Sequence, residues 1–376
     1  MRKTFAASFS LSLLFLAVSC EKNNVETNES LATPETYIFE RNGKSSVSYS
    51  GQTDRLNQLE EIKSKMQTAD AGNLVLESDL LAMYANANGD ANGNFSFSSS
   101  KQLKDKTFSL DQTYFEEILK SAAAASAIGN NGTLAANGQA GLISRSSGST
   151  ILVDENGFEF TQIFEKGIMG GVFYYQIVNN YLTDAKIGIG VDNITVDSVK
   201  NYTAMEHHWD EAFGYFGAPV DFSSEYQGSG SPRFWAKYSN SHDQVFGDFN
   251  NLFVNAYKRG RSAIVAKNHD VKNMDVAWLN IHFSSLAAAS AIHYANQAKA
   301  TTNQGDLLHV LSECYAFTRA LRYLNLDTRP LTPAEVDALL TSTFNDNLWD
   351  VTATDLNNLI DELSTTFELD PYKDIL

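Results

Sequence analysis

The stretch VKNMDVAWLNIHFSSLAAASAIHYANQAK, residues 271–299, decides the fold. It contains neither glycine nor proline, the two residues that most strongly interrupt a helix. Apolar side chains recur along it at the three- and four-residue spacing that brings them to one face of a helix. We therefore expect one long, continuous helix here and a fold assembled around helices.

The same spacing recurs on both sides of this segment, and only six prolines interrupt the whole chain. Thr203 with Glu206, and Thr332 with Glu335, form capping boxes that mark helix starts. Pro333 follows Thr332 at a position where the first turn of a helix tolerates proline. Further helices are predicted over residues 52–66, 109–127, 158–182, 203–216, 242–266, 306–324, 333–341 and 354–367.

The sequence therefore predicts a mostly α fold of helical bundles in a folded region over residues 35–376. We draw it as two packed lobes, 35–190 and 200–376, because the chain between them turns rich in Gly, Asp and Asn. Asn42-Gly43 is a dipeptide that favours tight hairpin turns, so one small N-terminal β-hairpin is also expected.

Three glycines interrupt the predicted helix 158–182: Gly167, Gly170 and Gly171. Glycine costs about 1 kcal/mol relative to alanine inside a helix. We expect these positions to mark a close helix crossing or a local bulge.

The N-terminus has the organisation of a bacterial lipoprotein signal. Arg2 and Lys3 precede an apolar run too short to span a bilayer, and Ser19-Cys20 closes it. This resembles the lipobox, which implies a signal peptide over 1–19, acylation of Cys20 and an outer-membrane lipoprotein on the periplasmic or cell-surface face. An ordinary secretory signal with an incidental cysteine is the alternative. The polar residues up to Pro34 are expected to form a disordered tether.

Charge and cysteine content narrow the possible partners. The net charge of −17 argues against nucleic acid, because phosphates select for Lys and Arg. With Cys20 carrying lipid, Cys314 has no disulfide partner and is expected on a buried helix stripe. The anticipated partners are a membrane, through the lipid anchor, and a metal ion or metal-carrying ligand, while protein partners stay open.

The strongest chemical signal is Glu206-His207-His208-Trp209-Asp210-Glu211. Residues three apart lie on adjacent turns of one helix face, so His208 and Glu211 could converge on one metal ion. A carboxylate beside an aromatic stripe needs a metal, a cation or a hydrogen-bond donor. The alternative is that Glu211 pairs with an arginine such as Arg319 or Arg322.

A second His and Glu pair stands four residues apart, at His309 and Glu313. Facing helices that each bring an imidazole and a carboxylate inward are typical of metal sites in bundles. Such ligands suit iron, zinc, copper or manganese. His282 and His293 could approach the same core, although each is more easily explained as a satisfied core histidine.

At these residues a resemblance can be stated. The segments MEHHWDEAFGYFG (205–217), LSE (311–313) and SSVSYSGQTDRLNQLEEIK (45–63) resemble a family of Bacteroidota lipoproteins, domain of unknown function 4856. That family is in turn similar to imelysin-like proteins, which are helical, consist of two bundles and carry a His-x-x-Glu motif linked to iron uptake. Only His208 and Glu211 match that motif, and the glycine before it is absent. The resemblance implies an all-α fold and a metal-linked function.

Two classes of function follow. The first is a lipid-anchored extracytoplasmic metal-binding protein of iron or related metal acquisition, with His208, Glu211, Glu313 and His309 as ligands. The second is a surface binding or scaffold lipoprotein that takes a peptide or glycan through exposed aromatics such as Phe234, Trp235 and Tyr238. An imelysin-type peptidase is the enzymatic variant, and the absence of a His-Glu-x-x-His pattern argues against it.

Overall fold

The computed structural model describes residues 31–228 and 230–376. Cys20 and the predicted signal peptide lie outside these residues. Within them the fold is mostly helical, as the sequence predicts, and no helix is long and apolar enough to cross a membrane. The α-helices are α1 (Ser50–Asp70), α2 (Glu77–Ala85), α3 (Gln112–Asn130), α4 (Phe160–Ile168), α5 (Asp184–Ile187), α6 (Ala204–Phe216), α7 (Trp235–Phe246), α8 (Phe249–Val265), α9 (His269–Ala300), α10 (Gln304–Ala320), α11 (Pro333–Phe344) and α12 (Ala353–Thr366).

The long helix α9 is the centre of the packing, which confirms the prediction made from residues 271–299. It contacts α8, α10 and α12. Its middle section buries the run Ala287, Ala288 and Ala289 completely, because small side chains let neighbouring helices approach closely. Cys314 of α10 packs on the same helix, with Sγ 3.4 Å from the Ala291 carbonyl oxygen. The expected burial of Cys314 is therefore confirmed.

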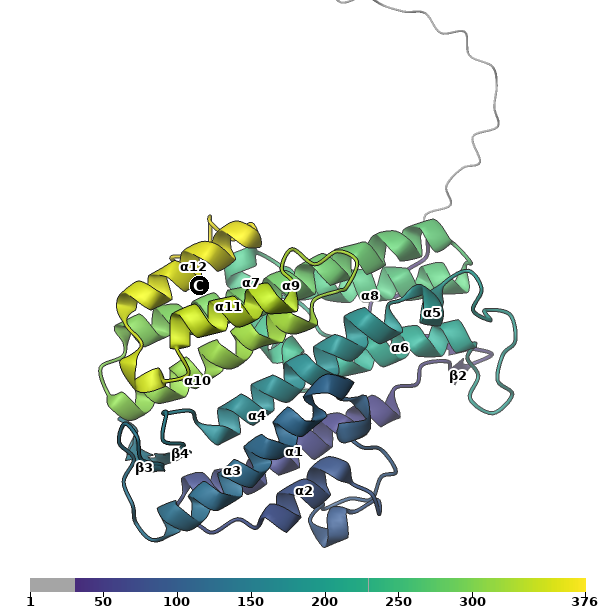
Figure 1. The fold of residues 1–376 in the computed structure, drawn as a ribbon. Helices are drawn as coiled ribbons and strands as arrows, with labels where there is room; N and C mark the ends of the chain where they lie inside the picture. The colour runs from purple at the N-terminus through teal and green to yellow at the C-terminus, as the bar shows by residue number, and fades with distance from the viewer. Residues whose placement is uncertain (1–30, 229) are drawn as a thin grey trace, which may run out of the picture. The chain divides into compact units, whose positions relative to one another are not determined.

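The remaining helices form layers on the two sides of α9 and α10 (Figure 1). On one side α4 packs against α10, and α1 and α3 pack against α4. On the other side α11 and α12 pack together, and α12 contacts α9. The α4–α10 contact crosses the division near 185–202 that the sequence suggests between two lobes. Residues 32–376 form a single compact unit by their contacts.

The predicted helix 158–182 is interrupted at its glycines. After α4 the backbone widens into two π-helical segments, η4 (Met169–Tyr174) and η5 (Ile177–Tyr181). A Cβ at Gly167 would stand 2.6 Å from the Phe115 ring, and one at Gly170 would stand 2.9 Å from the Ala320 side chain. Both expectations, close crossing and local bulge, are confirmed, because only glycine leaves room for these neighbours.

The N-terminal hairpin is present as β1 (Glu40–Arg41) and β2 (Lys44–Ser45), and its strands are shorter than expected. Asn42 and Gly43 both have positive φ, as the tight turn requires. A second hairpin, β3 (Gly141–Ser144) with β4 (Thr150–Val153), was not predicted.

The predicted helix 242–266 was wrong as one element. The chain forms α7 and α8 instead, and Gly247 and Asp248 between them have positive φ. Two left-handed residues in succession cannot continue a right-handed helix, so the break falls there. Short 3₁₀ turns complete the fold: η1 (Ala91–Gly93), η2 (Lys104–Lys106), η3 (Ser109–Asp111), η6 (Leu321–Tyr323) and η7 (Leu348–Asp350).

Candidate functional site

Helix α6 carries the motif 206–211, and its capping box at Thr203 and Glu206 is formed as predicted. Glu206 and Asp210, one turn apart, are the most deeply buried carboxylates of the motif. Arg261 of α8 is fully buried between them, 3.0 Å from an oxygen of each. Burial raises the pKa of Asp210 to about 6 although Arg261 opposes the shift. This part of the motif is a structural ion-pair network that joins α6 to α8.

His208 and Glu211 do not converge. The Nδ1 atom of His208 donates to the Lys186 carbonyl oxygen at 2.7 Å. Glu211 instead accepts hydrogen bonds from Gln52 at 2.9 Å and from the Tyr181 hydroxyl at 3.2 Å.

The histidine nearest to Glu211 is His207, with 3.9 Å between Nε2 and Oε1. The arginine alternative is also wrong, because Arg319 pairs with Asp111 and Arg322 pairs with Asp337.

The second predicted pair does come together, within a larger network. His309 of α10 lies between two carboxylates, with Nδ1 2.6 Å from Glu159 and Nε2 3.6 Å from Glu313. Burial opposes protonation of His309, but the hydrogen bond and charge of Glu159 outweigh it and raise the pKa. The raised pKa favours the protonated ring, whereas a metal ligand must be neutral.

The Glu313 carboxylate also forms an ion pair with a buried lysine. Lys166 of α4 is buried with its ammonium 3.0 Å from Glu313, 2.6 Å from Glu165 and 2.7 Å from the Gln162 amide oxygen. Lys63 of α1 reaches Glu165 from the other side at 2.8 Å. Although burial raises it, the charges of Lys166 and Lys63 lower the pKa of Glu165 to about 2. This network ties α1, α4 and α10 together.

The four predicted ligands therefore fall into two clusters, one on α6 and one on α10. Among the described residues no group of three or more His, Cys, Asp or Glu side chains is placed to hold a metal ion. Metal binding by His208, Glu211, Glu313 and His309 stays a prediction.

The structure reveals a different candidate, an open cavity of about 550 Å³. Solute-binding pockets typically measure about 300–1,000 Å³. The floor is the middle of α9, and the walls are the start of α8, the segment before α11 and the segment after α12. The lining residues are Phe246, Phe249, Leu252, Asn280, Ile281, His282, Ser284, Ser285, Leu324, Asn325, Thr328, Arg329, Pro330, Thr366, Phe367, Glu368, Leu369 and Tyr372.

The cavity has an aromatic end and a polar floor. Phe246 stands 4.8 Å from Phe249 and 5.0 Å from Tyr372 between ring centroids. On the floor, Asn280 is 8 % exposed, and its Oδ1 is covered and has no hydrogen-bond partner. Leaving a buried acceptor unpaired costs about 1–3 kcal/mol, and because this oxygen is covered, a ligand in the cavity does not reach it as the side chain stands.

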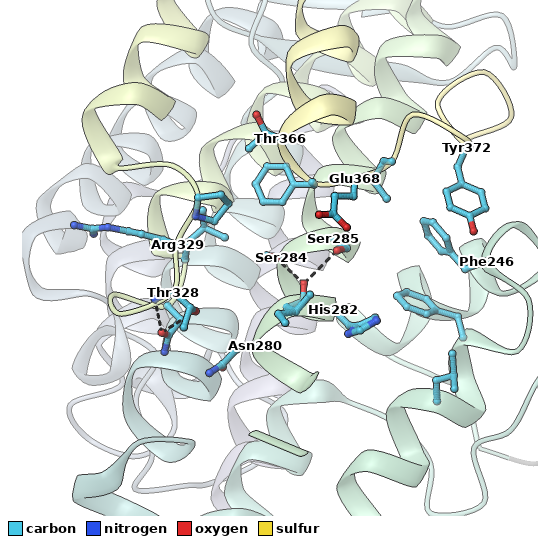
Figure 2. Close-up of a pocket in the computed structure, with 18 residues that line it drawn as sticks. Phe246, Asn280, His282, Ser284, Ser285, Thr328, Arg329, Thr366, Glu368 and Tyr372 are labelled. Carbon is cyan, nitrogen blue, oxygen red and sulfur yellow. Dashed lines mark hydrogen bonds between the residues drawn. The ribbon is translucent and has the colours of Figure 1, made fainter. Parts of the chain in front are cut away.

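Across the cavity the Glu368 carboxylate points toward the part of α9 that carries Ser284 and Ser285 (Figure 2). Glu368 follows α12 with φ of +57° and is exposed. The left-handed conformation ends the helix and turns this side chain over the cavity.

Sequence reasoning missed this site because its residues come from four separate segments. Asn280, Ser284 and Ser285 do carry a signal, since they place polar groups on a helix that is otherwise buried. His282 was singled out in the sequence, but as a residue of the core.

The fold and the cavity together define a mostly helical protein with a solute-sized, mixed polar and aromatic pocket over α9. The chain belongs to the family described as Domain of unknown function (DUF4856), whose model matches residues 34–370. No curated protein and no solved structure matches the chain. Similarity to imelysin-like proteins stays a prediction.

Proposed function

We propose that this protein is a lipid-anchored, extracytoplasmic binding protein that takes a small solute into the cavity over α9. The observation that carries the proposal is the cavity of about 550 Å³ with the exposed Glu368 carboxylate directed over its floor. Such a carboxylate favours any ligand that can donate a hydrogen bond to it. This is the binding class of function expected from the sequence, with a small solute in place of a peptide or glycan. The aromatics expected to be exposed for that role were wrong, because Phe234, Trp235 and Tyr238 are buried.

The lipid anchor is part of the same proposal and rests on the Ser19-Cys20 junction. Acyl chains on Cys20 would hold the protein at a membrane, since each buried methylene contributes about 0.8 kcal/mol. Fatty-acid labelling of the wild type and of Cys20→Ser tests it, and label retained by the variant would refute it.

A thermal-shift screen of polar small molecules tests the binding function. A ligand that binds only the folded state raises the melting temperature. Ser285→Trp should fill the cavity and abolish any such shift. Ser64→Trp is the matched control, because Ser64 is exposed on α1 and, like Ser285, its hydroxyl donates to the carbonyl four residues earlier. The proposal fails if no compound raises the melting temperature of the wild type more than it raises that of Ser285→Trp.

A second candidate, metal binding at Glu211, is favoured by one observation about His207. Its Nδ1 donates to the Ser48 carbonyl oxygen at 2.9 Å, which leaves Nε2 free to coordinate, 3.9 Å from Glu211. Burial lowers the pKa of His207, so the ring is neutral as a ligand must be. An ion about 2 Å from each atom would lie almost on the line between them, so tetrahedral zinc would need the two atoms to approach to about 3.3 Å. His207 would then replace His208 in the predicted pair.

A further inference from the structure

The hydroxyl groups of the cavity floor already donate their hydrogens to other groups of the protein. Ser284 donates to the Ile281 carbonyl oxygen at 2.6 Å, and Ser285 donates to the same oxygen at 3.2 Å. On the wall, the Thr328 hydroxyl donates to the Asn325 side chain at 3.1 Å. A hydroxyl has one hydrogen and two lone pairs, so each of these groups offers a ligand only acceptors.

His282 also offers a ligand an acceptor, because its ring hydrogen is already used within the protein. Its Nδ1 lies 2.8 Å from the Trp278 carbonyl oxygen, and since a carbonyl can only accept, Nδ1 carries the hydrogen. Burial lowers the pKa of His282, which keeps the ring neutral. The second ring nitrogen, Nε2, therefore presents a lone pair.

The charged residues of the lining also favour a ligand that donates hydrogen bonds and carries positive charge. Glu368 adds a carboxylate that no described residue neutralises, and Figure 2 shows it directed over the floor. Arg329 is the one cationic residue of the lining, and Figure 2 shows its side chain pointing away from the other labelled groups. The charge of Arg329 acts on Glu335 instead. Hydrogen bonds from Thr332 are the main cause of the lowered pKa of Glu335, and the charge of Arg329 adds to the shift.

The aromatic end fits the rest of such a ligand. Phe246, Phe249 and Tyr372 present rings that pack on a carbon chain and attract a cation to their faces. The net charge of −17 adds a long-range attraction for cations.

We infer that the cavity binds a protonated primary amine on an alkyl or arylalkyl chain, with the ammonium among Glu368, His282 and the α9 serines. An ammonium group has three donors and no acceptor, which is the complement of Glu368, His282 and the α9 serines. A carboxylate would be repelled by Glu368, and its acceptors would find no free hydrogen at His282 or at these serines. The inference rests on the proposed binding function and specifies its ligand.

Isothermal titration calorimetry with three probes of similar shape tests the inference. These probes are 2-phenylethylamine, neutral 2-phenylethanol and anionic phenylacetate. We expect the amine to bind at least about tenfold more tightly than the alcohol, a difference of about 1.4 kcal/mol, and the anion not to bind. Equal binding of amine and alcohol would overturn the inference.

Two substitutions locate the ammonium. Glu368→Gln keeps the shape and should weaken amine binding about tenfold or more, whereas Glu362→Gln, an exposed carboxylate of α12, should leave it unchanged. An unchanged affinity in Glu368→Gln contradicts the assignment. If the Ser285→Trp screen finds ligands and none is an amine, the binding function stands and this inference falls.

A further comparison distinguishes two sources of the amine, a free small molecule and a lysine side chain. A free diamine and a short peptide with one lysine and an acetylated N-terminus carry the same ammonium. Tighter binding of the diamine assigns the site to free amines, and tighter binding of the peptide assigns it to lysine side chains. Acetylation of that lysine should abolish peptide binding in the second case, and retained binding would contradict recognition of the ammonium.

Discussion

The imidazole of His282 lies face to face on the indole of Trp278, with 3.7 Å between ring centroids and 12° between ring planes. The two residues are one helical turn apart on α9, and the Nδ1 hydrogen bond to the Trp278 carbonyl fixes the ring. Because His282 lines the cavity, the state of the cavity is coupled to an intrinsic fluorophore.

We expect the emission of Trp278 to fall on acidification, because a stacked imidazolium quenches indole more strongly than neutral imidazole. Burial lowers the pKa of His282, so the midpoint should lie below the ordinary value of about 6.5. The measurement is a pH titration of the wild type minus Trp278→Phe. His282→Gln should remove the transition. A midpoint at or above the ordinary value would show that the stack is open to solvent.

The two histidines of α6 should differ in metal binding. If Glu211 holds an ion, His207→Ala should remove most of it, because losing one ligand disorganises the other. His208→Ala should retain the metal, since among the described residues only His207 brings a ring nitrogen within 4 Å of Glu211. Calorimetric titration with zinc and ferrous iron compares the two variants. Metal lost from His208→Ala and kept in His207→Ala would restore the pair expected from the sequence.

The ion pair of His309 with Glu159 should make stability depend on pH in a stated direction. The folded pKa of His309 is raised, so its stabilisation is complete below the unfolded value and disappears as pH rises through the folded value. His309→Gln should therefore cost roughly 2 kcal/mol at pH 6 and much less at pH 8.5. Urea denaturation at both pH values measures the difference.

A matched substitution, His269→Gln at the start of α9, controls for the loss of a histidine far from this network. Its effect should be small at both pH values. An equal cost of His309→Gln at both pH values would mean that the imidazole acts only by packing.

The crossing of α6 and α8 should not tolerate a methyl group at Gly260. A Cβ there would stand 2.1 Å from Cζ2 of Trp209, which is fully buried. We expect Gly260→Ala to destabilise the fold by about 2 kcal/mol through overpacking, despite the better helix propensity of alanine. Gly190→Ala is the control, because nothing lies within 4 Å of its Cβ position. Equal unfolding midpoints for the two variants would contradict the close crossing.

The sequence predicted elements well wherever a local pattern sets them. The long α9, the capping boxes of α6 and α11 and the glycine-marked bulge after α4 all depend on neighbours within a few residues. The break at Gly247 and Asp248 was missed because apolar periodicity continues across it while the backbone does not.

The candidate sites were harder to predict because they depend on which helices meet. His208 and Glu211 share a helix face, yet the Lys186 carbonyl and the Gln52 amide reach them first, from distant segments. Lys166 likewise lies beside Glu313 only because α4 packs on α10. The cavity is assembled from segments that no spacing rule connects.

The hairpin β1–β2 also has a mechanical meaning. The Tyr37 hydroxyl donates a hydrogen bond to Asp210, and the Tyr37 backbone N–H donates one to the Val220 carbonyl oxygen. Arg41 donates hydrogen bonds to Glu206 from both of its terminal nitrogens. Tension applied through the chain before residue 32 would first load the hydrogen bond from Lys258 of α8 to the Glu35 carbonyl oxygen, and then these bonds to α6. Because the ion pairs of Arg261 join α6 to α8, the two helices would take up the load together.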